Sequence, residues 1–191
     1  MNRDVYWTPT VGVGIESLHL IEDSAGVDVE SVVVGSAEDE SFRIRYEIEC
    51  DRRYRVRRVE VATLDRESAS ISLRADTEGN WTNGNGGPMT ILDGCTDVDI
   101  SVTPFTNTLP IRRLELNQGE STEIETVYIS VPDLHVETAI QKYTCLDPLD
   151  QDSGRYRYES VTSGFTAELP VDADGLVTDY PDLFDRVFPP E

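Results

Sequence analysis

Residues 93–116, DGCTDVDISVTPFTNTLPIRRLEL, place charged side chains in an otherwise apolar stretch. Asp97 and Asp99 lie two residues apart, so on one face of a strand their side chains are separated by about 6 to 7 Å. That spacing suits a hard cation or an acid–base pair. Arg112 and Arg113 follow within one crossing of a sheet, and buried guanidinium groups need carboxylate partners. We therefore expect a buried Asp–Arg network, either structural or lining a ligand site, with a solvated face as the alternative.

The elements around these residues decide whether they meet. The two aspartates alternate with valine and isoleucine in a pattern typical of a half-buried strand. A short helix is expected over 106–114, because Thr106 or Asn107 would cap it and Pro110 would lie in its first turn. A strand that starts at Ile111 is the alternative.

Short strands separated by turns fill most of the remaining chain. The segment 41–50, SFRIRYEIEC, alternates apolar and charged residues. In the segment 54–64, YRVRRVEVATL, the alternation slips by one residue, which predicts a β-bulge at Arg57 and Arg58. Turns rich in glycine and asparagine, such as NGNGGP at 83–88, separate such runs. This pattern predicts an all-β sheet that curls on itself.

The charge of the chain excludes several classes of partner. The sequence has 37 acidic and 16 basic residues, a net charge of −21, and Lys142 as its only lysine. Such a surface repels nucleic acid and anionic membranes. High ionic strength would screen the self-repulsion, and hydrated carboxylates would keep the protein in solution. We interpret the acidity as the surface adaptation of a halophile.

The cysteines and the chain's hydropathy indicate the compartment. Cys50, Cys95 and Cys145 contain no Cys-x-x-Cys pair, and their odd number indicates reduced thiols. The N-terminus has no secretory pattern, and no stretch approaches the roughly 18 apolar residues that span a membrane. We therefore expect a soluble cytoplasmic protein without integral membrane association.

Common catalytic and metal-binding motifs are absent from the sequence. It has no nucleophile elbow, no P-loop and no dinucleotide fingerprint. His19 and His135 have no partner at metal-ligand spacing, so they are interpreted as structural or exposed. No catalytic residue, cofactor or metal site is therefore assigned.

The run GCTDVDISVTPFTNTLPIRRLEL at 94–116 closely resembles the signature of the putative glycolipid-binding family, whose fold is a spiral β-roll. The resemblance covers nearly the whole chain, from YWTPTVGVGIESLHL at 6–20 to FTAELPVDADGLVTDYPDLF at 165–184. It implies a many-stranded sheet wrapped around a single helix. We therefore expect one mainly β domain over 1–191, a single antiparallel sheet curled into a roll or open barrel around a short central helix at about 106–114.

The resemblance also suggests a function. The family's glycolipid label rests on a likeness to carriers that hold acyl chains inside an open barrel, which is an analogy at the level of fold. It implies that the polar residues of 93–116 lie at the helix–sheet interface, inside the roll. We therefore favour a protein that binds a glycolipid or similar amphiphile over an enzyme. The expected ligand-binding residues are Tyr46, Trp81, Asp97, Asp99, Thr106, Asn107, Arg112 and Arg113.

Two alternatives stay open. The first is a hydrolase-like enzyme on a sugar or lipid substrate that uses Asp97 and Asp99. The second is a scaffold without a small ligand, in which the polar network serves only the fold. A cavity of several hundred Å³ would favour a ligand over a scaffold. The sequence is silent on the ligand's identity and on the oligomeric state.

Overall fold

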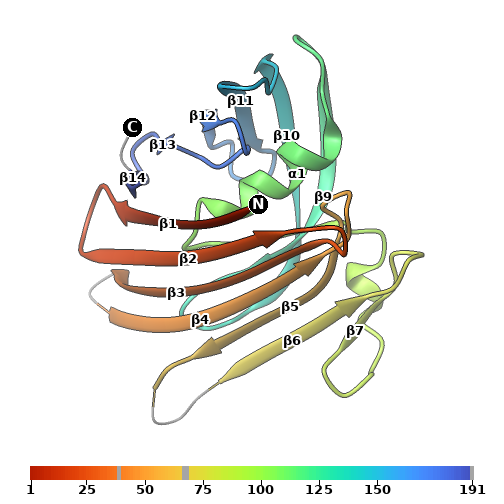
Figure 1. Ribbon diagram of the computed structural model, residues 1–191. Coiled ribbons are helices and arrows are strands. Elements are labelled where there is room, and N and C mark those ends of the chain that lie inside the picture. The colour runs from red at the N-terminus through yellow and green to blue at the C-terminus, as the bar shows by residue number, and fades with distance from the viewer. Residues whose placement is uncertain (38–39, 66–68, 190–191) are drawn as a thin grey trace.

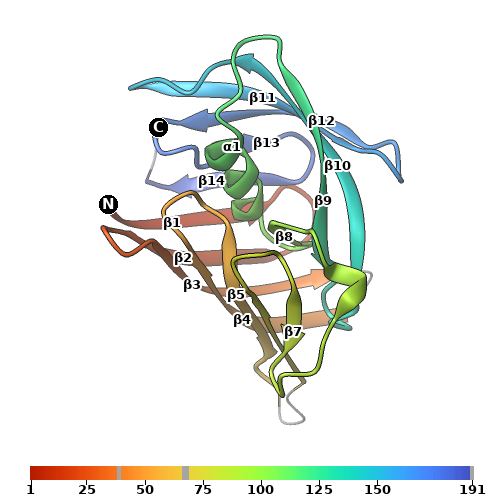
Figure 2. The ribbon, with the colours of Figure 1, turned by 90° about the vertical axis from the view of Figure 1, so that its right-hand side faces the viewer.

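The computed structural model describes residues 1–37, 40–65 and 69–189. These residues form two β-sheets that face each other across one short helix, α1 (Figures 1 and 2). The larger sheet has nine strands in the order β13-β14-β1-β2-β3-β4-β5-β6-β7, and the smaller has five in the order β12-β11-β10-β9-β8.

The larger sheet consists of β1 (Asn2–Pro9), β2 (Gly14–Glu22), β3 (Val27–Ala37), β4 (Glu40–Cys50), β5 (Val56–Thr63), β6 (Ser70–Ala75), β7 (Trp81–Asn83), β13 (Asp179–Tyr180) and β14 (Phe184–Phe188). The smaller sheet consists of β8 (Asp97–Ile100), β9 (Ser121–Ile129), β10 (Val136–Asp147), β11 (Ser153–Ser160) and β12 (Thr166–Asp172). The short helical segments are η1 (Thr90–Leu92), η2 (Phe105–Asn107) and α1 (Thr108–Leu114).

The prediction of a mainly β fold around one short helix is confirmed, but that of a single antiparallel sheet is wrong. Strand β8 belongs to the smaller sheet, not to the larger sheet that β7 ends. It runs parallel to β9, with Asp97 opposite Thr126 and Ile100 opposite Ile129. A parallel pair needs a long crossover, and here the crossover contains η2 and α1. The alternation within β8 predicts a strand but carries no information about its neighbour.

The predicted bulge between β4 and β5 is present. Glu49 pairs with Arg58, whereas the next residue, Cys50, pairs with Val56. Arg57 is therefore the extra residue on β5, and such a bulge increases the local bend and twist of the strand.

The expected helix is present, but it is not capped as predicted. The turn η2 runs directly into α1, so Asn107 already has helical backbone angles of −65° and −27°. A capping side chain needs an extended backbone. The Asn107 side chain consequently makes no capping hydrogen bond, and its amide oxygen Oδ1 instead accepts one from the Tyr143 hydroxyl at 2.8 Å. The helix ends at Leu114, and the next residue, Glu115, has a left-handed φ of +48°.

Helix α1 separates two apolar clusters. Leu109 packs into the larger cluster, which combines Trp7 and Tyr46 of the larger sheet with apolar residues of β8 and β9. Ile111 packs into the cluster on the smaller sheet, which includes Tyr143. The helix therefore fills the space between the sheets and fixes the position of one relative to the other.

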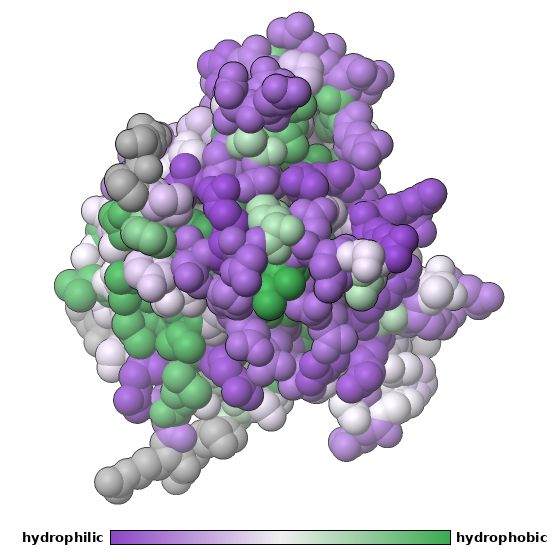
Figure 3. All heavy atoms as spheres, viewed as in Figure 1, coloured by the Kyte–Doolittle hydropathy of each residue, from purple (hydrophilic) through white to green (hydrophobic). Residues whose placement is uncertain are grey.

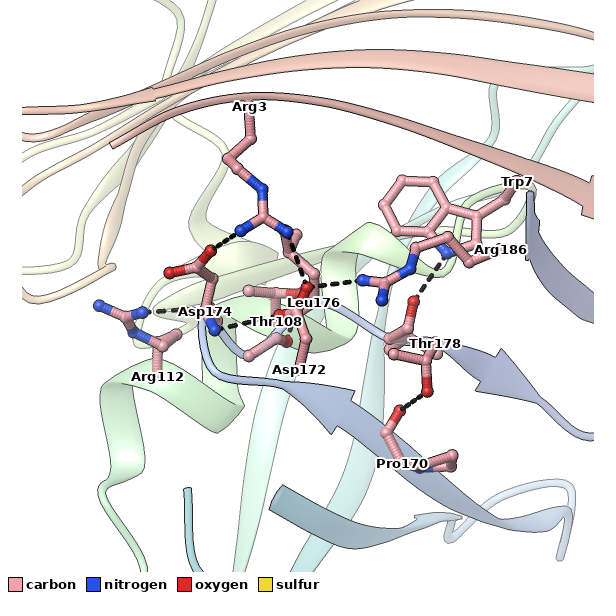
Figure 4. Close-up of polar contacts among 12 residues, drawn as sticks. Arg3, Trp7, Thr108, Arg112, Pro170, Asp172, Asp174, Leu176, Thr178 and Arg186 are labelled. Carbon is pink, nitrogen blue, oxygen red and sulfur yellow. Dashed lines mark hydrogen bonds and ion pairs between the residues drawn. The ribbon is translucent and has the colours of Figure 1, made fainter. Parts of the chain in front are cut away.

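A cluster of polar contacts on Asp172 joins the two sheets directly (Figure 4). Asp172 ends β12 of the smaller sheet, and its Oδ2 accepts from Arg3 of β1 at 3.1 Å and from Arg186 of β14 at 2.6 Å. The indole N–H of Trp7 donates to the carbonyl of Val177 at 2.8 Å. These contacts hold the chain after β12 against β1, so both strands beside it, β13 and β14, lie at the border between the sheets.

Two further predictions concern the cysteines and membrane-spanning segments. Cys50, Cys95 and Cys145 are all free and buried, as expected. No helix in the described part of the chain has the length and apolar character needed to cross a membrane.

Candidate ligand-binding cavity

A cavity of about 450 Å³ lies on the inner face of the smaller sheet, next to β13 and β14. Its walls come from β8, β9, β10 and β11, from η2, and from the turns before β12 and β14. This volume is within the range of small-molecule sites, about 300 to 1,000 Å³.

Asp99 provides the polar floor of the cavity. Its Oδ2 accepts a hydrogen bond from Nε2 of Gln141 at 2.6 Å, and its Oδ1 accepts one from the Thr106 hydroxyl at 3.2 Å. Asn107 lines the cavity beside it. Burial raises the pKa of Asp99, and the hydrogen bonds from Gln141 and Thr106 oppose this rise. The structure thus brings together three residues that the sequence predicted, with Gln141 added.

Aromatic rings form a second part of the cavity wall. Tyr158, Phe165 and Tyr180 contact one another, with ring centroids 6.2 to 6.3 Å apart. Phe184 continues the row, 6.3 Å from Tyr180. These distances are those of favourable aromatic pairs. The cavity is therefore lined both by a row of contacting aromatic rings and by a carboxylate and two amides.

The predicted ion pair lies next to this cavity. Arg113 of α1 contacts Asp97 of β8, with Nε 3.0 and 3.2 Å from the two carboxylate oxygens and Nη2 2.5 Å from Oδ2. Asp97 is 1% exposed and Arg113 15%. Burial raises the pKa of Asp97, and the guanidinium counteracts this. The described lining of the cavity includes neither Asp97 nor Arg113.

The family of the chain follows from comparison with known proteins. The model of the family described as "Putative glycolipid-binding" matches residues 4–186. The chain belongs to this family. A DUF1089 family protein from Pseudomonas aeruginosa, known from its crystal structure, is 35% identical and superposes with a TM-score of 0.82. The match covers 93% of this chain and 94% of that one. No curated protein matches the chain.

In this member of the putative glycolipid-binding family, Arg112 lies away from the cavity. Its Nη1 donates to the carbonyl of Asp174 at 3.1 Å, and its Nη2 to a carboxylate oxygen of Glu22 at 3.3 Å. The guanidinium carbon lies 4.7 Å from the centre of the Tyr54 ring. Arg112 borders a separate depression of about 470 Å³ formed mainly by loops. Its contacts join α1 to the larger sheet and to the turn after β12.

Two aromatic residues that the sequence predicted for the site are core residues of the larger sheet. Tyr46 is fully buried and Trp81 is 1% exposed. The indole N–H of Trp81 donates to the carbonyl of Cys95 at 3.0 Å. The Tyr46 hydroxyl donates to Glu16. Neither Tyr46 nor Trp81 belongs to the described lining of the cavity, whose aromatic residues are others.

Sequence reasoning missed Glu16, a buried residue whose carboxylate contacts Thr103 of the cavity lining. Hydroxyls of Ser31, Tyr46 and Thr103 all donate to its Oε1. Its Oε2 has no hydrogen-bond partner among the described residues. Burial raises the pKa of Glu16 to about 7, against the effect of the three hydrogen bonds. Thr103 also lines the cavity, so this hydroxyl connects the carboxyl to it.

The sequence pattern could have indicated two of the missed residues, Glu16 and Gln141. Glu16 has the same phase as Leu18 and Leu20 in β2, which places it on the buried face. Gln141 likewise shares the inward phase of Tyr143 in β10. A polar residue in the apolar phase of a strand was therefore the indicator of both.

Proposed function

We propose that the cavity binds the polar headgroup of a glycolipid or a similar amphiphile. The observation that carries this proposal is the pairing of a hydrogen-bonding floor, Asp99 with Gln141 and Asn107, with an aromatic wall that includes Tyr158 and Tyr180. Sugar rings present hydroxyls at their edges and apolar C–H groups on their faces. Mostly apolar pockets with a few placed polar groups are typical of small-molecule sites, and an aromatic wall offers a large apolar contact surface.

The neighbourhood of the cavity offers apolar surface for a hydrocarbon tail. A smaller pocket of about 110 Å³ is lined by Trp7, Val33 and Phe42 and shares Ser101 and Phe184 with the cavity. Its size admits the beginning of a chain but not a long acyl group, so most of a tail would lie outside it.

An exposed apolar patch extends from this smaller pocket. Figure 3 shows that one face of the molecule is largely hydrophilic but has hydrophobic residues gathered at one side. The turn between β1 and β2 contributes Val11 and Val13, which are 81% and 79% exposed. Ile15 and Val32 beside them are each 41% exposed. Val13 and Ile15 also line the smaller pocket, which makes the patch continuous with it.

The hydrolase alternative needs both Asp97 and Asp99 at the cavity, but only Asp99 belongs to its described lining. An acid–base or acid–nucleophile pair must flank the substrate bond. Asp97 is held by the Arg113 fork and is absent from the described cavity lining, whereas Asp99 faces the cavity. The arrangement therefore supports binding better than hydrolysis by this pair.

Calorimetric titration with a short-chain neutral glycolipid analogue, hexyl β-D-glucoside, tests the proposal. Ala139 of β10 lines the cavity, so Ala139→Trp should fill it and abolish binding. Ala62 of β5 lies opposite the exposed Arg45 on the outer face of the larger sheet, so Ala62→Trp is the matched control. Equal binding by wild type and Ala139→Trp, or no binding by wild type, would contradict the proposal.

A further inference from the structure

Two aspartates on one strand are treated differently by the fold. Asp97 faces α1 and receives the fork of Arg113. Asp99, two residues further along β8, receives only uncharged donors, the Gln141 amide and the Thr106 hydroxyl. No lysine, arginine or histidine of the described segments lies within ion-pair distance of Asp99. Asp99 is partly buried, and a carboxylate without a counter-ion in such a place costs free energy unless a cation reaches it or it is protonated.

The rest of the cavity repeats this imbalance of charge. Glu137 adds a second carboxylate at the rim, where it is 55% exposed. The described residues that line the cavity include no basic side chain. An anionic headgroup such as a phosphate would therefore meet two carboxylates and no partner, whereas a cation would meet two.

The aromatic wall is also suited to a cation. A positive nitrogen is attracted to the face of an aromatic ring within about 6 Å of its centre. Tyr158, Phe165 and Tyr180 lie in mutual contact and line the same cavity as Asp99. An ammonium group in this cavity would have both aromatic rings and the carboxylate of Asp99 among its lining residues.

We infer that the headgroup bound in the cavity carries a cationic nitrogen, as in an amino sugar, and that Asp99 is its counter-ion. This inference rests on the proposed function, since it names the chemical class of the headgroup that the same cavity takes. It explains why the fold neutralises Asp97 internally and leaves Asp99 to the ligand. The burial that raises the pKa of Asp99 is then offset when the cation arrives.

Two probes that differ in one group test the inference on the wild-type protein. Hexyl 2-amino-2-deoxy-β-D-glucoside is cationic near neutral pH, and hexyl β-D-glucoside is its neutral counterpart. With both titrated calorimetrically at one salt concentration, the amine should bind about tenfold more tightly, which corresponds to about 1.4 kcal/mol. Equal affinities, or tighter binding of the neutral glucoside, would overturn the inference and leave the proposed function standing. Binding of neither probe would overturn both.

Two variants locate the preference. Asp99→Asn retains the size of the side chain and removes its charge, so it should lower the affinity for the amine about tenfold and leave that for the neutral glucoside nearly unchanged. Glu125→Gln, at an exposed position of β9 outside the described lining of the cavity, is the matched control and should change both affinities less than twofold, since exposed charges are screened. An amine preference that persists in Asp99→Asn would also overturn the inference, because the counter-ion would lie elsewhere.

Discussion

Arg113 forms a bidentate ion pair with Asp97, with Nε 3.0 Å from Oδ1 and Nη2 2.5 Å from Oδ2. The contact joins the last turn of α1 to strand β8, two elements that meet across the interior. Because Asp97 is almost completely buried, its charge depends on this partner. The pair therefore holds the helix at the position where η2, directly before it, contributes Asn107 to the cavity.

Removal of Arg113 should destabilise the fold strongly. Arg113→Ala leaves the Asp97 carboxylate buried without a counter-ion, and the free energy of unfolding should fall by about 3 to 5 kcal/mol. Urea unfolding followed by circular dichroism measures this change. The double variant Arg113→Ala with Asp97→Ala should recover part of the loss, because contacting residues are not additive.

Arg155 provides the control for this experiment. Its side chain is 50% exposed and pairs with Asp147 and Glu168 on the surface of the smaller sheet. Arg155→Ala should cost well under about 1 kcal/mol. If Arg113→Ala costs no more than Arg155→Ala, the fork contributes nothing and the account of α1 positioning is wrong.

Glu16 should make stability depend on pH. Its pKa rises from 4.5 to about 7 on folding, so the folded state binds the proton more tightly than the unfolded state. The stabilisation is complete below pH 4.5 and is lost as the pH rises towards 7. The free energy of unfolding should therefore fall by about 3 kcal/mol from this group over that range.

Other carboxyl groups titrate in the same range, so the test compares variants. Glu16→Gln keeps the shape and cannot lose a proton. Its free energy of unfolding should vary less between pH 5 and pH 7 than that of the wild type, by most of the difference stated above. Glu137→Gln, at an exposed position, should keep the wild-type profile. Parallel profiles for wild type and Glu16→Gln would show that Glu16 does not titrate as stated.

Salt should stabilise the protein. The net charge of −21 produces repulsion that the folded state concentrates. From about 10 mM to 1 M salt the Debye length falls from about 30 Å to about 3 Å, which screens this repulsion. The melting temperature should therefore rise with potassium chloride. A melting temperature that stays constant or falls would contradict the interpretation of the acidity as an adaptation to salt.

Local pattern explains what the sequence could predict. The bulge at Arg57 is visible as a slip in alternation, and the helix at 108–114 follows from the run around Pro110. A pairing of Asp97 or Asp99 with Arg112 or Arg113 follows from charge placement, because a charge is costly to bury alone; the structure shows that the pair is Asp97 with Arg113. These features depend on residues close together in the chain or on a single compensating partner.

The features that the sequence did not reveal depend on long-range geometry. Phe165 and Tyr180 belong to the turn before β12 and to β13, and only the docking of these segments brings them to Tyr158. The division into two sheets depends on β8 choosing β9 as its neighbour, which no alternation pattern encodes. Tyr46 was assigned to the site because aromatic residues bind ligands, but in this fold it is a core residue.

Analysis of what co-purifies with the protein tests the central claim most directly. Protein isolated from its native host without detergent, in wild-type and Ala139→Trp forms, is examined by native mass spectrometry and lipid extraction. The account predicts a sugar-bearing amphiphile on the wild type and its absence from the variant whose cavity is filled. An empty wild-type protein, or the same amphiphile in equal amount on both forms, would contradict it.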